Sequence, residues 1–453
     1  MAFLPTDSLK AKVVLALFIG SSNMSAYGAD LLDIYRLALL NDPTFEVARY
    51  SLKSAQQKHP QALAGLLPTV NINGVNNLTR AQTQFSNSPS TNRYVHAWNW
   101  SLQLTQPLIR LQNMYAYDEA DQAVEQAQAQ YALAEQDLIL RITQAYFGVL
   151  SSREGIRVAE AELAATEEQL ALAKHGFERG VAVITDVREG QSRADLARSH
   201  RVTAQNELDA KLAELAKIVD DVPDQLAMLD SAATLPLPQP NDQQYWISQA
   251  RENNPAVRAA LSGLLVTEAI VGKARAEHAP TLDLVASYGE NYSSGSTTLP
   301  TDYASKGQSK QVGIQFTAPL FAGGGTSAHV TEAISNKYRA GAELEVARRQ
   351  AATDARLSYA GVVNGSSQIT ALESAVESNL SMVKQSHAGY KQGIYNNAKV
   401  LDAEQQFYMA KRDLVKARYE TLFQALKLKA ATGSLSEADL SNANTFFVPY
   451  KAE

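Results

Sequence analysis

The sequence predicts an α+β membrane protein made of two copies of one unit, each combining long helices with a β-hairpin. Three observations support this fold class: two long proline-free stretches, short segments that alternate polar and apolar residues, and motifs repeated at a fixed offset. Proline breaks the interior of a helix. Very long helices therefore fit between Pro107 and Pro223 and between Pro319 and Pro449, where Ala, Gln, Glu and Leu are abundant.

Four motifs of the first half recur in the second half in the same order. The offset is 212 positions for the first three pairs and 213 for the last. Self-similarity at a fixed spacing is the sequence signature of an internal repeat. We therefore interpret the chain as a tandem duplication. The pairs, given by their first residues, are Asn41 and Asn253, Leu67 and Ala279, Leu102 and Ile314, and Phe177 and Tyr390.

The repeats divide the chain into segments. Each repeat is expected to hold an initial helix, a β-hairpin (68–108 and 280–320) and a long helical hairpin (109–221 and 321–435). The expected order is a signal peptide over 1–29, a first repeat over 30–221, a linker or equatorial segment over 222–244, a second repeat over 245–435 and a C-terminal tail over 436–453.

Period-two alternation predicts four strands per chain, each with one apolar and one polar face. Four strands do not close a barrel, an open sheet edge is not tolerated in lipid, and known membrane barrels start at about eight strands. Three copies would supply twelve strands, enough for a wide lumen. A soluble sheet with an aromatic core is the alternative. In the membrane interpretation, an aromatic girdle would include Tyr94, Trp98, Trp100, Tyr288 and Tyr292.

The long helices carry seams of small and apolar residues. From Ala116 to Val149 the steps follow an 11-residue pattern, which favours nearly straight or right-handed winding. From Ile156 to Phe177 and from Val400 to Ala417 they follow a heptad, which predicts left-handed coiled coils. We expect helices packed side by side as a wall that ends in coiled-coil hairpins.

The N-terminus predicts export. Lys10 and Lys12 precede an apolar run over 13–19, and small residues follow at 25–29, as in a secretory signal peptide. A membrane anchor would need about 20 apolar residues, and we expect no later segment to supply them. The chain has no cysteine and a net charge of −6, so thiolate chemistry and nucleic-acid binding are not expected.

The residues predict no enzyme, cofactor or metal site. Gly323, Gly324 and Gly325 are not followed by the Gly-Lys-Ser/Thr of a phosphate-binding loop, so a flexible junction is the better interpretation. The seven histidines form no ligand pair at helical spacing. No two carboxylates are placed by the sequence as an acid and base pair.

The sequence resembles the TolC family of outer-membrane export channels over the whole mature chain. The resemblance implies a homotrimer, whose 12-stranded β-barrel in outer-membrane lipid is continuous with a 12-helix α-barrel that crosses the periplasm. It also implies a periplasmic adaptor (membrane fusion) protein and an inner-membrane ABC or proton-driven transporter as partners. The residues that carry it lie at 41–43, 66–68, 101–106, 145–150, 180–187 and 400–403.

The resemblance further implies an export conduit that opens like an iris at its coiled-coil tips. Its cargo would be drugs, other small molecules or unfolded proteins. Thr185 and Asp186 fall on one half of the family's gate network and Tyr390 on the other. Tyr395 stands where the family has an arginine. The ion pairs that help to hold the gate closed in the family therefore differ in this chain.

The family narrows its entrance with two aspartate rings one helical turn apart. This chain has Asp402 at the second position and Lys399 at the first. We therefore expect an entrance that is less cation-selective and less easily blocked by multivalent cations. An aspartate on a heptad helix is otherwise usually a solvated surface residue.

The tips of the helical hairpins are candidate contacts for the adaptor. Simple turn chemistry is the alternative, because glycine supplies a positive φ. Two other classes of protein remain open: a secreted trimeric coiled coil with a structural or adhesive role, and a periplasmic adaptor. The tip residues are Arg179, Gly180 and Val181, with Gln392, Gly393 and Ile394.

Overall fold

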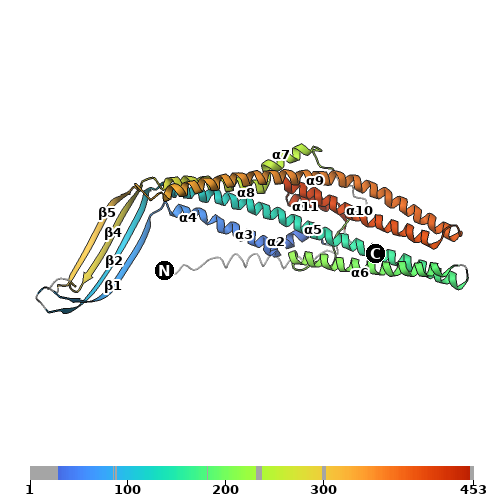
Figure 1. Cartoon of the computed structure of the whole chain (residues 1–453), viewed down its shortest axis with the longest axis horizontal. Helices are drawn as coiled ribbons and strands as arrows, with labels where there is room; N and C mark the ends of the chain where they lie inside the picture. The colour runs from blue at the N-terminus through green and yellow to red at the C-terminus, as the bar shows by residue number, and fades with distance from the viewer. Residues whose placement is uncertain are drawn as a thin grey trace, which may run out of the picture. The chain divides into compact units, whose positions relative to one another are not determined.

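The computed structural model describes residues 29–84, 86, 89–180, 182–230, 237–297 and 303–448. Within these residues the chain is mostly helical, with one four-stranded and one two-stranded sheet (Figure 1). The expected signal peptide, apart from Ala29, lies outside the described residues, as does the tip residue Val181.

The chain forms two compact units, and each takes segments from both halves of the sequence. The sheet unit contains Val47–Leu133 and Glu252–Gln350. The hairpin unit contains the described residues up to Glu46, those within Ala134–Arg251, and those from Ala351 onward. A predicted repeat is therefore not a compact unit by itself.

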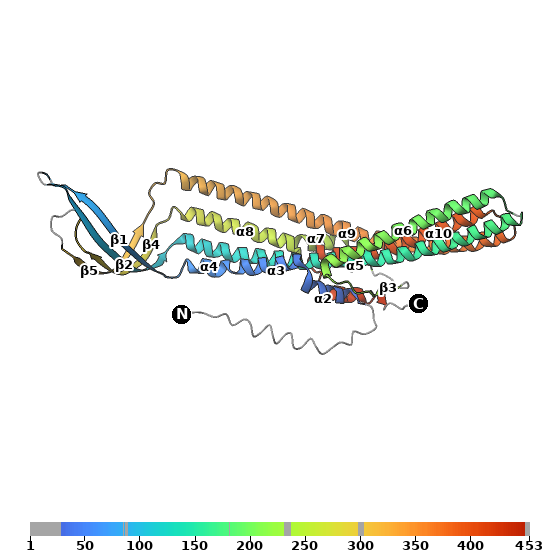
Figure 2. The ribbon, with the colours of Figure 1, turned by 90° about the horizontal axis from the view of Figure 1, so that it is seen from below.

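The sheet unit is built around four antiparallel strands in the order β1-β2-β4-β5 (Figure 2). In the register, Leu102 of β2 lies opposite both Ile72 of β1 and Tyr288 of β4. The register of β2 against β4 shifts between Pro107 and Ile109, where the strand leaves for the helices. The strands are β1 (Thr69–Thr83), β2 (Thr91–Ile109), β4 (Thr281–Ser293) and β5 (Ser305–Thr317).

Two helices begin at a proline that directly follows an Asp or Asn residue. Asp42 Oδ2 accepts a hydrogen bond from the Phe45 N–H (3.0 Å), and Asn254 Oδ1 accepts one from the Ala256 N–H (2.8 Å). Proline suits the next position because the first helical N–H has no partner within the helix. These helices are α3 (Pro43–Gln56) and α8 (Pro255–Ala276); α4 (Lys58–Ala64) follows α3.

Two helical hairpins dominate the hairpin unit. Helix α5 (Leu111–Glu178) turns into α6 (Ile184–Val219), and α9 (Gly325–Lys391) turns into α10 (Asn397–Ala431). Gly180 and Gly393 adopt φ of 75° and 70° at these turns, a backbone region that favours glycine. The other elements are α2 (Leu31–Asn41), β3 (Met228–Leu229), α7 (Gln243–Asn253), α11 (Glu437–Asn444) and β6 (Phe447–Val448).

Tyr146 of α5 lies in the core of the hairpin unit. Its side chain is fully buried, and its hydroxyl donates to the carbonyls of Ala29 (3.2 Å) and Ala227 (2.8 Å). Phe147 beside it stacks on Phe447, with ring centroids 5.8 Å apart. This one helical turn therefore connects the first described residue, the linker and the tail.

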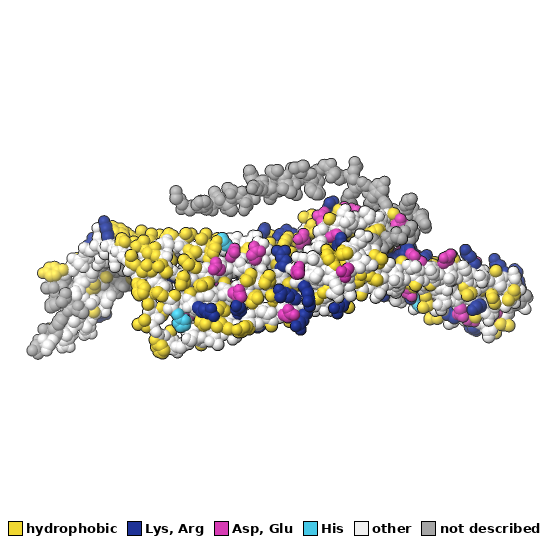
Figure 3. All heavy atoms as spheres, turned by 90° about the horizontal axis from the view of Figure 1, so that it is seen from above, with side chains coloured by type: hydrophobic (Ala, Val, Ile, Leu, Met, Phe, Trp, Pro, Cys, Tyr) yellow, Lys and Arg dark blue, Asp and Glu magenta, His cyan; other side chains and the backbone are white. Residues whose placement is uncertain are grey.

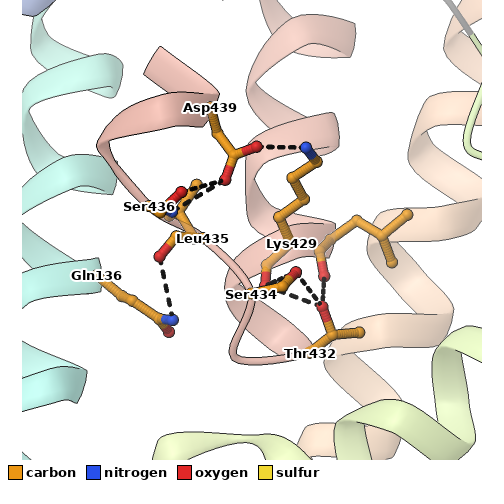
Figure 4. Close-up of polar contacts among 8 residues, drawn as sticks. Gln136, Lys429, Thr432, Ser434, Leu435, Ser436 and Asp439 are labelled. Atoms are coloured by element: carbon orange, nitrogen blue, oxygen red, sulfur yellow. Dashed lines mark hydrogen bonds and ion pairs between the residues drawn. The ribbon is translucent and has the colours of Figure 1, made fainter. Parts of the chain in front are cut away.

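The expected tail carries structure that belongs to this core. Lys429 of α10 pairs with Asp439 of α11, whose Oδ2 also accepts from the Ser436 N–H at 2.9 Å (Figure 4). Gln136 of α5 reaches the Leu435 carbonyl at 3.5 Å. Strand β6 then pairs with β3 of the expected linker, so linker and tail form a small sheet.

Among the residues that the structure describes, one helical stretch is long and apolar enough to cross a membrane, judged by its length and composition alone. It runs over Gln243–Ala276, and an 18-residue part of it has a mean hydropathy of 1.3. This stretch corrects our expectation that no segment after the N-terminus would qualify. Only 22% of the 18-residue part is buried. A core helix of a soluble protein meets the same criterion, and α7 and α8 within this stretch are separate helices interrupted at Asn254.

Candidate functional site

The four-stranded sheet has two chemically different faces. One face is apolar and exposed, and the other is lined by amides and hydroxyls. An exposed apolar face of this extent indicates contact with another protein or with lipid. The apolar face includes Val70, Ile72, Leu102, Val312, Ile314 and Phe316. The polar face has a groove lined by Ser101, Gln103, Ser287, Gln311 and Gln315.

Aromatic rings continue the apolar face toward the loops that join β1 to β2 and β4 to β5, which we call the hairpin end of the sheet. Trp98 stacks on Tyr292 with centroids 5.8 Å apart, and Trp100 meets Tyr288 edge to face at 5.5 Å. Tyr94 follows on the same face of β2 and is exposed. The five residues expected to form an aromatic girdle thus share one face of the sheet.

Exposed apolar side chains also occur on the helices of the sheet unit. Hydrophobic side chains gather on the helical surface beside the strands (Figure 3). Leu261 and Leu265 of α8 and Tyr338 of α9 are among the exposed ones. Helices with this much uncovered apolar surface favour packing against further helices.

The expected gate residues lie at the ends of the two helical hairpins. Thr185 and Asp186 are in the first turn of α6, where Asp186 Oδ2 accepts from the Val183 N–H at 3.4 Å. Tyr390 is in the last turn of α9, and the Tyr395 ring packs over Gly389. Among these four described residues, no side-chain hydrogen bond joins one hairpin to the other within the chain.

The expected adaptor contacts are exposed at the same tips. The described ones are Arg179 and Gly180 in the first hairpin and Gln392, Gly393 and Ile394 in the second. Ile394 is 67% exposed.

The two expected entrance residues differ in their contacts. Lys399 is exposed in the first turn of α10, whose N-terminus is capped by Asn396. The Asp402 carboxylate instead pairs with Arg193 Nη2 of α6 at 2.8 Å, and Arg193 Nη1 donates to Gln405 Oε1 at 2.7 Å. Sequence reasoning missed Arg193, which links the two hairpins.

A second polar contact joins α9 to α10 and involves Glu404, two residues beyond Asp402. Glu404 is 6% exposed, and its Oε1 accepts from His387 Nε2 of α9 at 2.9 Å. Burial raises the pKa of the Glu404 carboxyl, Glu168 of α5 adds to the increase by repulsion, and the bond to His387 opposes it only in part. Glu404 also borders a small cavity with Glu162 and Thr166 of α5, Arg193 and His200 of α6, and Tyr408.

The Glu404→Gln variant is expected to remove a pH-dependent part of the stability of the hairpin unit. A raised pKa means that the folded state binds this proton more tightly than the unfolded state. The contribution is complete below pH 4.5, the ordinary pKa of the group, and is lost as the pH rises through the higher folded-state value. Thermal unfolding of both proteins between acid and neutral pH measures it; equal slopes would contradict the assignment.

The chain is similar to known export proteins along most of its length. It is 30% identical to the outer membrane protein TolC of Escherichia coli, covering 95% of this chain and 88% of that protein. It is 29% identical to the alkaline protease secretion protein AprF of Pseudomonas aeruginosa, covering 93% and 88%. The solved structure of the outer membrane protein VceC from Vibrio cholerae superposes with a TM-score of 0.75 at 19% identity, covering 89% and 96%.

The fold, the two-faced sheet and these similarities define an outer-membrane export channel. The family model for outer membrane efflux proteins matches residues 34–219 and 246–434. The chain belongs to this family, the TolC family, whose members are transport channels rather than enzymes. Its location is the outer membrane of a Gram-negative bacterium.

Proposed function

We propose that three copies of the chain form a conduit that exports small molecules or unfolded proteins across the outer membrane. The observation that carries this proposal is the four-stranded sheet, with its exposed apolar face and its edge strands β1 and β5. Lipid does not satisfy the backbone groups of an open edge. Pairing β5 of one copy with β1 of the next satisfies them, and three copies give a closed barrel of twelve strands.

The same assembly would explain the exposed helices. Three copies place further helices against the uncovered apolar side chains of α8 and α9, which supports a 12-helix α-barrel. The recurring order of helix, hairpin and helical hairpin supports the tandem duplication. The four strands per chain follow directly from it.

The partners are proposed from the family. Exposed tips at Arg179–Gly180 and Gln392–Ile394 support docking of a periplasmic adaptor protein, which would couple the conduit to an inner-membrane transporter. The names of the relatives include both efflux and protease secretion, so we retain an ABC and a proton-driven transporter as alternatives. The entrance would carry a ring of Lys399 beside a ring of Asp402.

The gate is proposed to lie at the hairpin tips, where Thr185, Asp186, Tyr390 and Tyr395 meet neighbouring helices of the trimer. The ion pair between Asp402 and Arg193 supports a further contact within each chain that holds the gate closed. This contact would take over the role of the family arginine, whose position is occupied by Tyr395. Each exposed hydrogen bond contributes only about 1 kcal/mol, so such a lock is reversible.

Single-channel recording in a planar lipid bilayer tests the proposal. The purified mature protein is expected to give small, stable current steps, and replacing Asp186 and Tyr390 by Ala is expected to increase the step severalfold. Tyr50→Ala, on the exposed face of α3, serves as the control with an unchanged step. Protein that passes no current even with the gate residues replaced would favour the secreted coiled coil instead.

A further inference from the structure

Positive charges on the described strands gather on the apolar face of the sheet. These strands contain four Lys and Arg residues. Arg80, Lys306 and Lys310 lie on the same face of the sheet as Ile72 and Ile314. Arg93 lies on the opposite face. A polar face was available to them on the same strands. Their position on the apolar face therefore indicates a function on that face.

These three residues, which we call the cationic band, lie beside the aromatic rings. Lys310 Nζ is 5.6 Å from the ring centroid of Tyr288, to which it is directly opposed in the register. Arg80 is 5.6 Å from the ring of Tyr94, again directly opposite. Tyrosine rings at such distances orient a cation without neutralising it.

The cationic band keeps most of its charge. Lys306 pairs with Glu290 at 2.6 Å, and its side chain is still 60% exposed. Arg80 and Lys310 are exposed and have no ion pair among the described residues. The band therefore carries three cations against one carboxylate, in a chain whose net charge is −6. A general excess of positive charge does not explain it.

The order of residues along the strands resembles a section through a membrane surface. On β5, Phe316, Ile314 and Val312 come first from the helical side, and Lys310 and Lys306 follow toward the hairpin end. On β1, Val70 and Ile72 precede Arg80 in the same direction. Apolar residues match the hydrocarbon, aromatic rings match the interface, and cations match the anionic headgroups beyond it.

We propose that the cationic band binds phosphate groups of membrane lipids at the hairpin end of the sheet. This inference rests on the proposed function, because only insertion of the sheet brings lipid to this face. The aliphatic stems of Lys306 and Lys310 would lie along the apolar surface while their ammonium groups reach the phosphates. The bound lipids would then fix the depth of the barrel in the membrane.

Energy transfer from tryptophan to a labelled lipid tests this proposal. The purified mature protein is reconstituted in phosphatidylcholine vesicles that contain a trace of dansyl-labelled diphosphoryl lipid A or its phosphate-free form. Trp98 and Trp100 are the donors beside the band. We expect stronger transfer to the phosphorylated lipid, because that lipid is enriched around the protein, and a loss of this preference at high salt.

Variants separate the cationic band from charge in general. Replacing Arg80, Lys306 and Lys310 by Gln is expected to lower the preference by about fivefold per cation at low ionic strength. Glu290→Gln is expected to raise it. The matched control replaces Lys384, Lys411 and Lys416 of α9 and α10 by Gln and should leave it unchanged.

Current recordings in the same lipids distinguish the two proposals. A protein that conducts, but shows no preference for the phosphorylated lipid, would disprove the lipid site and leave the channel intact. An equal loss in the band variant and the control would also overturn the site. A protein that neither inserts nor conducts in either lipid would disprove the channel and the site together.

Discussion

Tyr146→Ala is expected to lower the free energy of unfolding of the hairpin unit by about 3–5 kcal/mol, the usual range for removing a large buried aromatic side chain. The ring is fully buried and lies against Phe147 and Phe447, with ring centroids 6.2 and 5.9 Å away. Thermal unfolding in detergent, followed by circular dichroism, measures the loss.

The Tyr146→Phe variant separates packing from hydrogen bonding. It keeps the ring but leaves the Ala227 carbonyl without the hydroxyl that reaches it at 2.8 Å, so we expect a loss of about 1 kcal/mol. Tyr303→Ala, at a side chain that is 78% exposed, should change little. Equal losses for the Ala and Phe variants would show that packing of the ring contributes nothing.

Asp42→Ala is the second change with a large expected effect, a loss of about 2–4 kcal/mol. The Asp42 carboxylate is buried, pairs with Arg141 at 2.7 Å, and caps α3 through the Phe45 N–H. Removing the carboxylate leaves the partly buried Arg141 guanidinium with less negative charge beside it. It also removes the cap of α3. Arg141 is 30% exposed, which keeps the loss below that of a fully buried pair.

Asp137→Ala is the matched control, since Asp137 contacts the same guanidinium at 2.7 Å but is 56% exposed. We expect a loss below about 1 kcal/mol for this variant. Similar losses for the Asp42→Ala and Asp137→Ala variants would contradict this account.

The contribution of Asp42 depends on pH. Burial alone would raise the pKa of Asp42, but hydrogen bonds and the charge of Arg141 outweigh it and lower the pKa. The contribution of Asp42 to the free energy of unfolding is therefore present above pH 3.8, and it is lost as the pH falls through the lower folded-state pKa.

Local signals in the sequence were sufficient to predict the long helices and the four strands of the larger sheet. Proline spacing and small-residue seams predicted the long helices, and alternation predicted the four strands, because both depend on neighbours within a few residues. Tandem repetition remains an interpretation, although the order of elements agrees with it.

Contacts between distant segments were not predictable in this way. Arg193 and Asp402 are 209 positions apart, and only the packing of α6 against α10 brings them together. Strands β3 and β6 contain two residues each, which is too short for any alternation to appear. The Glu404–His387 bond joins residues only 17 positions apart, but it was missed because neither residue belongs to a motif. The functional roles of the gate, entrance and tip residues stay predictions.

The composition of the two units has a consequence for biogenesis. Strands β1 and β2 come from the first half of the chain and β4 and β5 from the second, and the hairpin unit likewise uses both halves. Neither half of the chain contains the whole of either unit. During synthesis from the N-terminus, neither unit has all its parts until the second half has followed, so apolar strands and helix faces stay uncovered for a long time. We therefore expect the emerging chain to depend on holding chaperones until it is complete.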